Sequence, residues 1–534
     1  MNRSDLTAKQ REAVDARENA LLVIGGAGTG KTSLALWAAR TELERPENAG
    51  SRALFLTFSR TAVDQIATRS KAVVSGIESR IEVSTFHSFA YRILRRFGHL
   101  AGVTERNPTV QSASEAKLLG QSVDRLVYDD LMPLALRVLE TPAVAGLFAQ
   151  RWCMVVCDEF QDTGDEHWDL LSMLRVSSRL MLLGDEHQSI FGFLAHKGVQ
   201  PGRIRDTATL VDRVVELEQV SHRDPTGAIP ALASSIRERR FGDESVRDAI
   251  AEGRLRIHSG VEDDGVVELI GGTLDGAWQR GCRTFGVFAH SNQSVAELSL
   301  QLADANVEHE LVGLPDAEAD ALYAMLASTR YAYREAEWPD VKVALGTFLT
   351  ASTRGSPPPL AHALASDTPL PSALEERLDG VMASLVNAAE ESLAEVAAVA
   401  AEAWTSLGVV AGNAPWERSA PSFISLCKRT EGRGERHLDD LAAAIGQMRA
   451  SAMFDSRRRR SPAVQVMNLH QTKGRESDAV VILFSDSDFH GREVEPFPEA
   501  SRLLYVVLTR ARKEITVILG GDPHPLVAPF GSLT

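Results

Sequence analysis

The sequence predicts an α/β protein with two lobes, each built on parallel strands and each carrying a mostly helical insertion. Two observations lead to this prediction. Short apolar runs of strand length alternate with segments of helical periodicity, which is typical of buried parallel strands in α/β layers. The apolar runs also fall into two groups, one before about residue 200 and one after about residue 280.

The order of these runs along the chain defines the expected domains. The predicted strands are "ALLVIGG", "ALFLTFS", "MVVCDE" and "RLMLLGDE" in the first group, and "TFGVFAH", "AVVILFSD" and "EITVILGG" in the second. The segments between them that show helical spacing without clear strands are assigned to insertions. The expected division is 1–97 and 151–210 for the first lobe, 98–150 for its insertion, 211–313 and 462–534 for the second lobe, and 314–461 for its insertion.

Composition narrows the class of protein. The chain has 534 residues, of which 44% are hydrophobic and 24% charged, as in ordinary globular proteins. No stretch approaches the roughly 18 apolar residues of a membrane span, and the polar N-terminus lacks a signal-peptide core. Four scattered cysteines do not form a disulfide framework. We therefore expect a cytoplasmic protein with no membrane partner.

The charge distribution leaves nucleic-acid binding open. The formal net charge of −15 argues against a uniformly basic surface. Local basic clusters nevertheless occur in "YRILRRF" from Tyr91, "IRERRF" from Ile236 and "SRRRRS" from Ser456. Each cluster fits a solvated helix face as well as a nucleic-acid track.

The stretch "GGAGTGKT" follows the first predicted strand and opens a helix. It matches G-x-x-x-x-G-K-[ST] in the strand–loop–helix context of a phosphate-binding loop, which disfavours an ordinary glycine-rich turn. Lys31 is expected to reach the β- and γ-phosphates of ATP, and the Thr32 hydroxyl to ligate Mg²⁺. The loop residues expected to surround the phosphates are Gly25, Gly26, Ala27, Gly28, Thr29 and Gly30.

The stretch "VVCDEFQDT" places acidic residues at the end of another predicted strand. Asp158 suits the second Mg²⁺ ligand, and Glu159 suits the general base that accepts a proton from the attacking water. The carboxylates tolerate one another because Lys31 and Mg²⁺ supply countercharge. For Asp162 and Asp165 a structural acidic turn remains an alternative.

A third strand end, "LLGDEHQSIFGF", offers Gln188, whose amide is able to sense a γ-phosphate from the neighbouring strand. Phe191 and Phe193 follow in a loop. Near a nucleotide site such aromatic residues are either core residues or stacking platforms for bases.

Together, these three motifs resemble the UvrD/Rep type of superfamily 1 DNA helicases, and further stretches match in the family order. "LTAKQREAV" resembles the Q motif, which implies that Gln10 reads adenine. "LFLTFSRTAVDQI" and "STFHSFAYRIL" resemble motifs Ia and Ib. With motifs III and V, the resemblance implies single-stranded DNA contacts from Thr57, Phe58, Ser59, His87, Phe191, Phe193 and His470.

The second half of the chain continues the resemblance. "LEQVSHRDPTGAI" resembles motif IV, which places Arg223 at the γ-phosphate. "VMNLHQTKGRESDAVVIL" resembles motif V, which directs Glu476 to the ribose, and "ASRLLYVVLTRARKEITV" resembles motif VI, with Arg510 as the arginine finger. The implied catalytic set is therefore Lys31, Glu159, Gln188, Arg223 and Arg510.

The resemblance implies two RecA-like lobes that close on ATP and open after hydrolysis, and so move along single-stranded or 3′-tailed DNA in the 3′-to-5′ direction. The sequence departs from the family pattern at Leu194, where an arginine is usual, in motif IV, and in a short first insertion. After Arg510 no nuclease domain is expected. These departures favour, as the alternative, a DNA-end-sensing ATPase subunit that regulates a partner nuclease in repair or phage defence. A non-hydrolysing binding module fits the intact motifs poorly.

Overall fold

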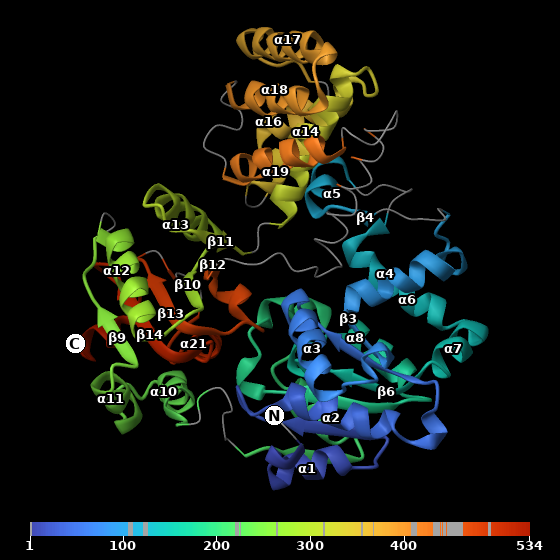
Figure 1. The fold of residues 1–534 in the computed structure, drawn as a ribbon, viewed down its shortest axis with the longest axis vertical. Coiled ribbons are helices and arrows are strands. Elements are labelled where there is room, and N and C mark those ends of the chain that lie inside the picture. Colours follow the sequence, from blue (N-terminus) through green and yellow to red (C-terminus); the bar gives the residue numbers. More distant parts are fainter. Residues whose placement is uncertain are drawn as a thin grey trace. The chain divides into compact units, whose positions relative to one another are not determined.

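The computed structural model describes residues 3–104, 110–120, 126–218, 224, 226–262, 265–312, 315–353, 356–366, 368–406, 414–430, 438, 441, 445, 463–486, 488–489 and 493–533. The chain divides into two units (Figure 1). Unit 1 comprises Met1–Ala90, Ala135–Gly313 and Arg458–Thr534, and unit 2 comprises Tyr91–Leu134 and Leu314–Arg457. Unit 1 holds two six-stranded sheets, which form the cores of the first and second lobes.

The sheet of the first lobe is entirely parallel. In spatial order its strands are β3 (Ile81–Thr85), β2 (Arg52–Thr57), β6 (Trp152–Cys157), β7 (Arg179–Gly184), β1 (Ala20–Ile24) and β8 (Arg213–Glu216). Because the strands are parallel, their carboxyl ends meet at one edge, where α/β proteins bind ligands. The ends of β1, β7 and β6 carry the three motifs, and β7 lies between the other two.

Helices cover both faces of this sheet. They are α1 (Ala8–Asp15), α2 (Lys31–Leu43), α3 (Arg60–Val73), α7 (Pro142–Ala149), α8 (Asp165–Leu174) and α9 (Arg203–Ala208), with α4 (Phe86–Phe97) and α6 (Leu131–Leu139) each running between the two units. Apolar residues of α1, α2 and α3 pack on alternate residues of the strands, such as Leu21 and Val23. Thr7 and Ser59 begin α1 and α3 with side-chain caps to backbone N–H groups.

Two of the predicted domain boundaries are wrong. Residues 135–150 were assigned to the first insertion, yet they belong to unit 1, which includes Ala135–Gly313. Residues after 210 were assigned to the second lobe, yet β8 pairs with β1 in the first sheet, with Leu21 opposite Arg213 and Ile24 opposite Glu216. Leu217 is also buried in the core of the first lobe. The first lobe therefore extends at least to residue 217.

The second lobe has the same architecture. Its parallel strands, in spatial order, are β11 (His309–Leu311), β12 (Val464–Asn468), β10 (Phe285–Ala289), β13 (Ser477–Phe484), β14 (Ala511–Leu519) and β9 (Leu255–His258). The helices α12 (Val266–Gln279) and α13 (Asn292–Asp304) share a core with one face of the sheet. The other face packs against α10 (Ala228–Arg237), α11 (Glu244–Ala251) and α21 (Pro498–Leu508).

The seven predicted apolar runs all form strands in these two sheets, which confirms the α/β class. Most of the strands that were not predicted lie at sheet edges. In β3 and β9, for example, three of the residues in each strand are only partly buried. An edge strand with one solvated side lacks the continuous apolar run that marks a central parallel strand.

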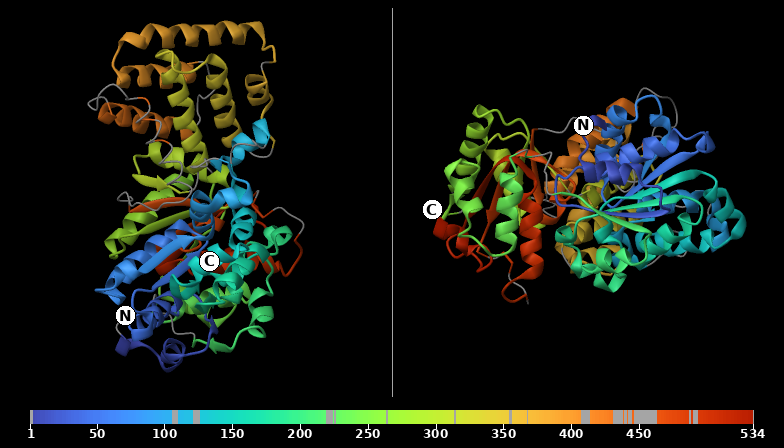
Figure 2. Two further views of the ribbon diagram at one scale, coloured as in Figure 1. Left: turned by 90° about the vertical axis from the view of Figure 1, so that its right-hand side faces the viewer. Right: turned by 90° about the horizontal axis from the view of Figure 1, so that it is seen from below.

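Unit 2 is mostly helical. It contains α5 (Ala113–Leu119), α14 (Pro315–Ala332), α15 (Trp338–Ala351), α16 (Pro359–Ala365), α17 (Ser372–Asn387), α18 (Leu393–Ser406) and α19 (Ala414–Thr430). Figures 1 and 2 show α17 alongside α18. Trp404 is fully buried, stacks on Trp338 at 5.9 Å and donates from Nε1 to Ser328 Oγ at 2.8 Å. A short parallel pair, β4 (Val110–Gln111) and β5 (Leu126–Val127), was not predicted.

Within the described part of the chain, no single helix has both the length and the apolar character needed to cross a membrane. The bent pair Tyr128–Leu139 and Pro142–Phe148 meets these requirements only when both helices are counted together.

Candidate active site

The phosphate-binding loop runs from the end of β1 to the start of α2. Gly28 and Gly30 have φ values of 78° and 81°, a left-handed conformation that side chains disfavour. A Cβ on Gly25 would lie 2.7 Å from Thr29 Oγ1. The Lys31 ammonium donates to the carbonyl oxygens of Gly25 at 2.6 Å and Gly26 at 3.1 Å. The loop therefore has the curvature that a phosphate cradle requires, with its lysine folded onto the loop carbonyls.

Gln10 connects helix α1 to this loop. Its Nε2 donates to the carbonyl oxygen of Thr29 at 2.8 Å, and its Oε1 accepts from the Thr7 N–H at 2.9 Å. The side chain is 2% exposed. Gln10 thus braces the P-loop, and its contact with adenine stays a prediction.

Asp158 lies at the end of β6, where it faces the start of α2. Its Oδ2 accepts a hydrogen bond from the Thr32 hydroxyl at 2.8 Å. Burial, together with the neighbouring Glu159, raises the pKa of Asp158. A buried carboxylate beside a hydroxyl oxygen fits the oxygen ligand set that Mg²⁺ prefers, and a bound cation would counter the raised pKa. Thr32 and Asp158 are therefore suited to hold the metal.

Glu159, the next residue, has a backbone φ of 58°. A left-handed non-glycine residue is costly and often marks a functional site. Gln161 donates from Nε2 to Glu159 Oε2 at 2.6 Å. Burial alone would raise the pKa of Glu159, but Lys473, Lys31 and this hydrogen bond outweigh it and lower the pKa. The carboxylate is therefore ionised at neutral pH, as a general base must be.

Lys473 of the second lobe reaches the acidic motif of the first. Its ammonium is 2.5 Å from Asp162 and 3.8 Å from Glu159, and it donates to the Gln188 carbonyl oxygen at 2.7 Å. Burial raises the pKa of Asp162 to about 7, although Lys473 opposes this shift. Sequence reasoning assigned Lys473 no role. The sequence feature that could have indicated a role is its position in motif V, because the chain has only nine lysines.

Gln188 and Arg510 meet across the same junction. Arg510 is 2% exposed, and its Nη2 donates to Gln188 Oε1 at 3.2 Å. Its Nε donates to the Val506 carbonyl oxygen at 2.7 Å, which orients the guanidinium. Gln188 in turn donates from Nε2 to Asp185 Oδ2 at 2.7 Å. The structure thus brings together the expected sensor amide and arginine finger.

Glu476 makes ion pairs with both lobes. Its carboxylate is 3.4 Å from Arg69 of α3 and 2.9 Å from Arg512 of β14. A contact with the ribose requires Glu476 to exchange one of these partners, so this role stays a prediction. Arg223, the expected γ-phosphate arginine of motif IV, lies outside the described residues.

The expected DNA-contacting residues divide into two groups. Thr57 is fully buried, with no hydrogen-bond partner for its hydroxyl among the described residues, so its assignment to the DNA surface is wrong. At the end of a central strand, its side chain points into the lobe. The side chains that are partly exposed belong to Phe58, Ser59, His87, Phe191 and His470, and the Phe193 side chain is outside the description.

The partly exposed residues have defined neighbours. The Phe58 ring lies 4.9 Å from Phe86 and 5.0 Å from His167. Ser59 lies beside the second lobe, because a Cβ on Gly474 would be 3.1 Å from its Oγ. Phe191 lies beneath the Lys473 ammonium, at 5.4 Å. Burial lowers the pKa of His470.

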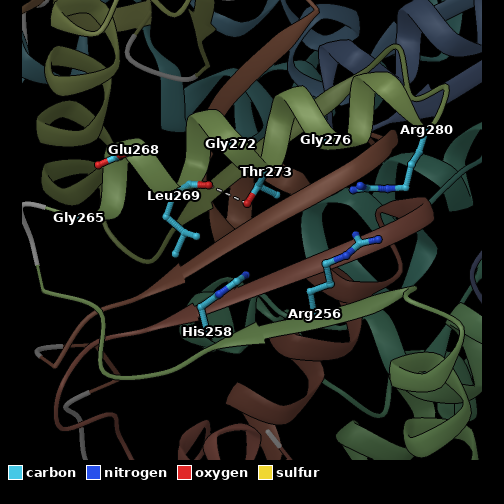
Figure 3. A pocket seen from close by; sticks show the side chains of 9 residues that line it. All are labelled: Arg256, His258, Gly265, Glu268, Leu269, Gly272, Thr273, Gly276 and Arg280. Atoms are coloured by element: carbon cyan, nitrogen blue, oxygen red, sulfur yellow. Dashed lines mark hydrogen bonds between the residues drawn. The ribbon is translucent and has the colours of Figure 1, made fainter.

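A separate recess of about 600 Å³ lies between α12 and β9 in the second lobe (Figure 3). Gly272 and Gly276 leave it open on the helix side, while Arg256 and Arg280 flank it. Both arginines pair with Glu514, at 2.8 Å and 3.0 Å. With Glu268 also in the wall, the recess is close to electrically neutral.

The P-loop on β1, the acidic pair on β6 and an arginine supplied by the second sheet define a two-lobed P-loop nucleoside triphosphatase. Comparison with known families agrees. Residues 6–127 and 120–197 match the UvrD/REP helicase N-terminal domain, and residues 418–520 match the UvrD-like helicase C-terminal domain. The matched ranges span more than half of the chain. The chain belongs to the UvrD/REP helicase family and is an ATP-hydrolysing enzyme.

Individual relatives match over different lengths. The ATP-dependent DNA helicase UvrD2 of Mycobacterium tuberculosis is 24% identical over an alignment 602 residues long. The alignment covers 96% of this chain and 78% of that protein. The ATP-dependent DNA helicase PcrA of Leuconostoc citreum is 26% identical over 249 residues. PcrA of Staphylococcus aureus is 24% identical over the same length. In each of these two matches, the matched segment covers 35% of this chain and about a third of the PcrA protein.

Proposed function

We propose that the protein is an ATP-dependent translocase and helicase that moves along single-stranded DNA in the 3′-to-5′ direction. The observation that carries this proposal is the contact of Arg510 and Lys473 of the second lobe with Gln188 and Asp162 of the first. Both contacts lie beside the residues that surround the γ-phosphate in a P-loop enzyme. Nucleotide hydrolysis at this junction would change the contacts between the lobes and so move them.

The chemistry follows from these side chains. The oxygen of a water molecule attacks the γ-phosphorus, and Glu159 accepts a proton from that water. The bond between the γ-phosphorus and the oxygen that bridges the β- and γ-phosphates breaks, and ADP leaves with this oxygen. Gln188 orients the water, and Arg510 and Lys31 stabilise the negative charge that develops on the transferred group. Bound Mg²⁺, for which Thr32 and Asp158 are the ligands, would neutralise charge on the β- and γ-phosphates.

The proposed partner is single-stranded or 3′-tailed DNA. Phe58, Phe191 and Phe193 would stack on bases, while Ser59, His87 and His470 would contact the strand. Thr57 is left out because it is buried. We place the activity in the cytoplasm, a reducing compartment, which suits the four free cysteine thiols.

A strand-displacement assay tests this function. The duplexes carry a 3′ tail, a 5′ tail or no tail, with and without ATP, and the Lys31→Ala variant serves as the inactive control. The proposal predicts ATP-dependent displacement of the 3′-tailed duplex alone. ATPase stimulation by DNA without displacement would instead favour an end-sensing subunit that regulates a partner nuclease. Equal displacement of the 5′-tailed duplex would contradict the proposed direction.

A further inference from the structure

A second cavity, of about 420 Å³, lies where the two lobes of unit 1 meet. Glu186 and His187, which follow β7, and Arg205 of α9 line it from the first lobe. The second lobe contributes the end of α10, with Arg237, Glu238 and Arg239, and Arg502 of α21. None of the P-loop residues belongs to its lining.

The charge of this lining is positive. Four arginines, Arg205, Arg237, Arg239 and Arg502, face two glutamates. Glu238 pairs closely with Arg237, at 2.5 Å, whereas Glu186 is 3.9 Å from Arg205. Glu495 is also close enough to Arg239 to act on its charge, so the arginines that line the cavity exceed the nearby carboxylates by about one, unlike in the neutral recess beside α12.

The arginines differ in how many of their donors are already used. Arg239 donates from Nη1 and Nη2 to the carbonyl oxygens of Leu526 and Pro525, and Arg502 donates from Nε to that of Ser189. Arg237 donates from Nη2 to Glu238 Oε1, and its Nε is buried without a hydrogen-bond partner among the described residues. An anion in the cavity would compensate the charge of these guanidinium groups.

Two of these guanidinium groups are held in place by aromatic rings. Arg237 lies over the Tyr505 ring at 5.9 Å, and Arg239 lies over Phe241 at 5.1 Å. Donors that are already ordered bind an anion with less loss of conformational entropy. Planar guanidinium groups match phosphate oxygens in pairs.

Tyr505 separates this cavity from the nucleotide site. Its hydroxyl oxygen lies beside the P-loop, 3.6 Å from where a Cβ on Gly26 would be, and its ring contacts Arg237 and His187 of the cavity lining. The cavity thus adjoins the P-loop without sharing its residues.

We propose that this cavity is a second oxyanion site, which binds a phosphate monoester or inorganic phosphate through Arg205, Arg237 and Arg502. The phosphate group has two sources, free phosphate in solution and the terminal phosphate of a nucleic acid strand. The site is separate from the P-loop and does not depend on the helicase activity proposed above.

Calorimetry on the full chain tests the site. The protein is first saturated with Mg²⁺ and a non-hydrolysable ATP analogue, which fills the P-loop and reports separately whether that loop binds nucleotide. Inorganic phosphate is then titrated, and in a second arm a short oligonucleotide with either a 5′-phosphate or a 5′-hydroxyl. The variants are Arg237→Gln and Arg205→Gln. Arg240→Gln is the matched control, because Arg240 pairs with Glu238 at 2.7 Å but does not line the cavity.

The proposal predicts one further binding event with phosphate or with the 5′-phosphorylated strand, at least about tenfold weaker in Arg237→Gln and unchanged in Arg240→Gln. Arg205 is highly exposed and tolerates substitution, so weaker binding in Arg205→Gln supports the site even if Arg237→Gln is unstable. Absence of binding at millimolar phosphate and to both oligonucleotides overturns the proposal. Equal binding of the 5′-phosphate and 5′-hydroxyl strands, together with phosphate binding that is weaker in Arg237→Gln, supports free phosphate as the ligand. Equal phosphate affinity in all variants overturns the proposal.

Discussion

Arg510 of the second lobe donates a hydrogen bond from Nη2 to the amide oxygen of Gln188 in the first lobe, at 3.2 Å. The two residues are 322 positions apart in the sequence. Arg510 is also bound to the Val506 carbonyl oxygen of α21, which ends at Leu508, so the guanidinium has a fixed direction. The Arg510–Gln188 contact connects the proposed arginine finger with the amide that we propose to orient water.

Glu159 is the proposed general base. Glu159→Gln removes this proton acceptor but keeps Lys31, Thr32 and Asp158, which we expect to bind Mg-ATP. We expect binding of Mg-ATP to be retained while turnover falls by about 10² to 10⁴, the usual share of general-base catalysis. Equilibrium binding of a fluorescent ATP analogue and steady-state ATPase rates measure the two effects. Turnover close to wild type would show that another group accepts the proton.

Lys473 should control the pH dependence of turnover. It helps to hold the pKa of Glu159 down. Without Lys473 the pKa of Glu159 rises. As the pH is lowered, kcat of Lys473→Gln should therefore begin to fall at a higher pH than kcat of the wild type. Lys513→Gln is the control, because Lys513 is an exposed lysine that contacts only the Gly281 carbonyl oxygen among the hydrogen bonds described. Superimposable acidic limbs in the two variants would contradict this role.

Lys473→Gln should also destabilise the protein above neutral pH. The pKa of Asp162 is raised to about 7 even with Lys473 beside it. Without Lys473 this pKa rises further, so at pH 6 Asp162 is protonated and needs no cationic partner. As the pH rises through this higher pKa, an unpaired buried carboxylate forms, and the loss should approach about 3 kcal/mol. Denaturant unfolding of wild type and variant at pH 6 and pH 8.5 measures the difference, and an equal loss at both pH values would argue against a buried charge.

His167 should make the first lobe sensitive to acid. Burial, and then the charge of His87, lowers the pKa of His167 to about 3. Between about pH 6.5 and pH 3, the unfolded chain therefore binds a proton at His167 that the folded chain does not bind. The contribution of neutral His167 to the free energy of unfolding is fully present above pH 6.5 and is lost as the pH falls. The slope is at most about 1.4 kcal/mol per pH unit.

His167→Gln isolates this effect. The N–H of Gly164 donates to His167 Nδ1 at 3.2 Å at the start of α8, and a glutamine three residues after the cap keeps such a bond. The variant should lose less stability than wild type between pH 7 and pH 5, by up to about 2 kcal/mol. Thermal melts of both proteins across that range provide the measurement, and parallel curves would show that His167 does not titrate.

Much of the first lobe was predictable, because the central strands and the P-loop are local features. A continuous apolar run followed by glycines predicts both a buried strand and its phosphate-binding end, as in β1 and Gly25–Lys31. The edge strand β8 was assigned to the wrong lobe, because its pairing with β1 joins segments almost two hundred residues apart. No local pattern encodes such a pairing.

Side-chain direction and long-range contacts limited the prediction of the site. The motif around Thr57 was predictable, but both faces of β2 are covered, so every residue from Ala53 to Thr57 is buried and the strand end does not reach the surface. Lys473 acquires its role only when the second lobe brings it to the Gln188 carbonyl oxygen, 285 positions away. The position of Asp158 and Glu159 at the end of β6 was predictable because the two residues directly follow a continuous apolar run.

The central claim is that both lobes together form the ATP-hydrolysing site, and Arg510 tests it most directly. Steady-state ATPase rates of wild type, Arg510→Ala and Arg510→Lys are measured with saturating single-stranded DNA, alongside a thermal melt. An arginine finger contributes about 10³ to 10⁵ to the rate. We predict that Arg510→Ala binds ATP within about tenfold of wild type but loses DNA-stimulated hydrolysis, and that lysine rescues it poorly. Full DNA-stimulated turnover per folded molecule, with only a lower melting temperature, would contradict the account.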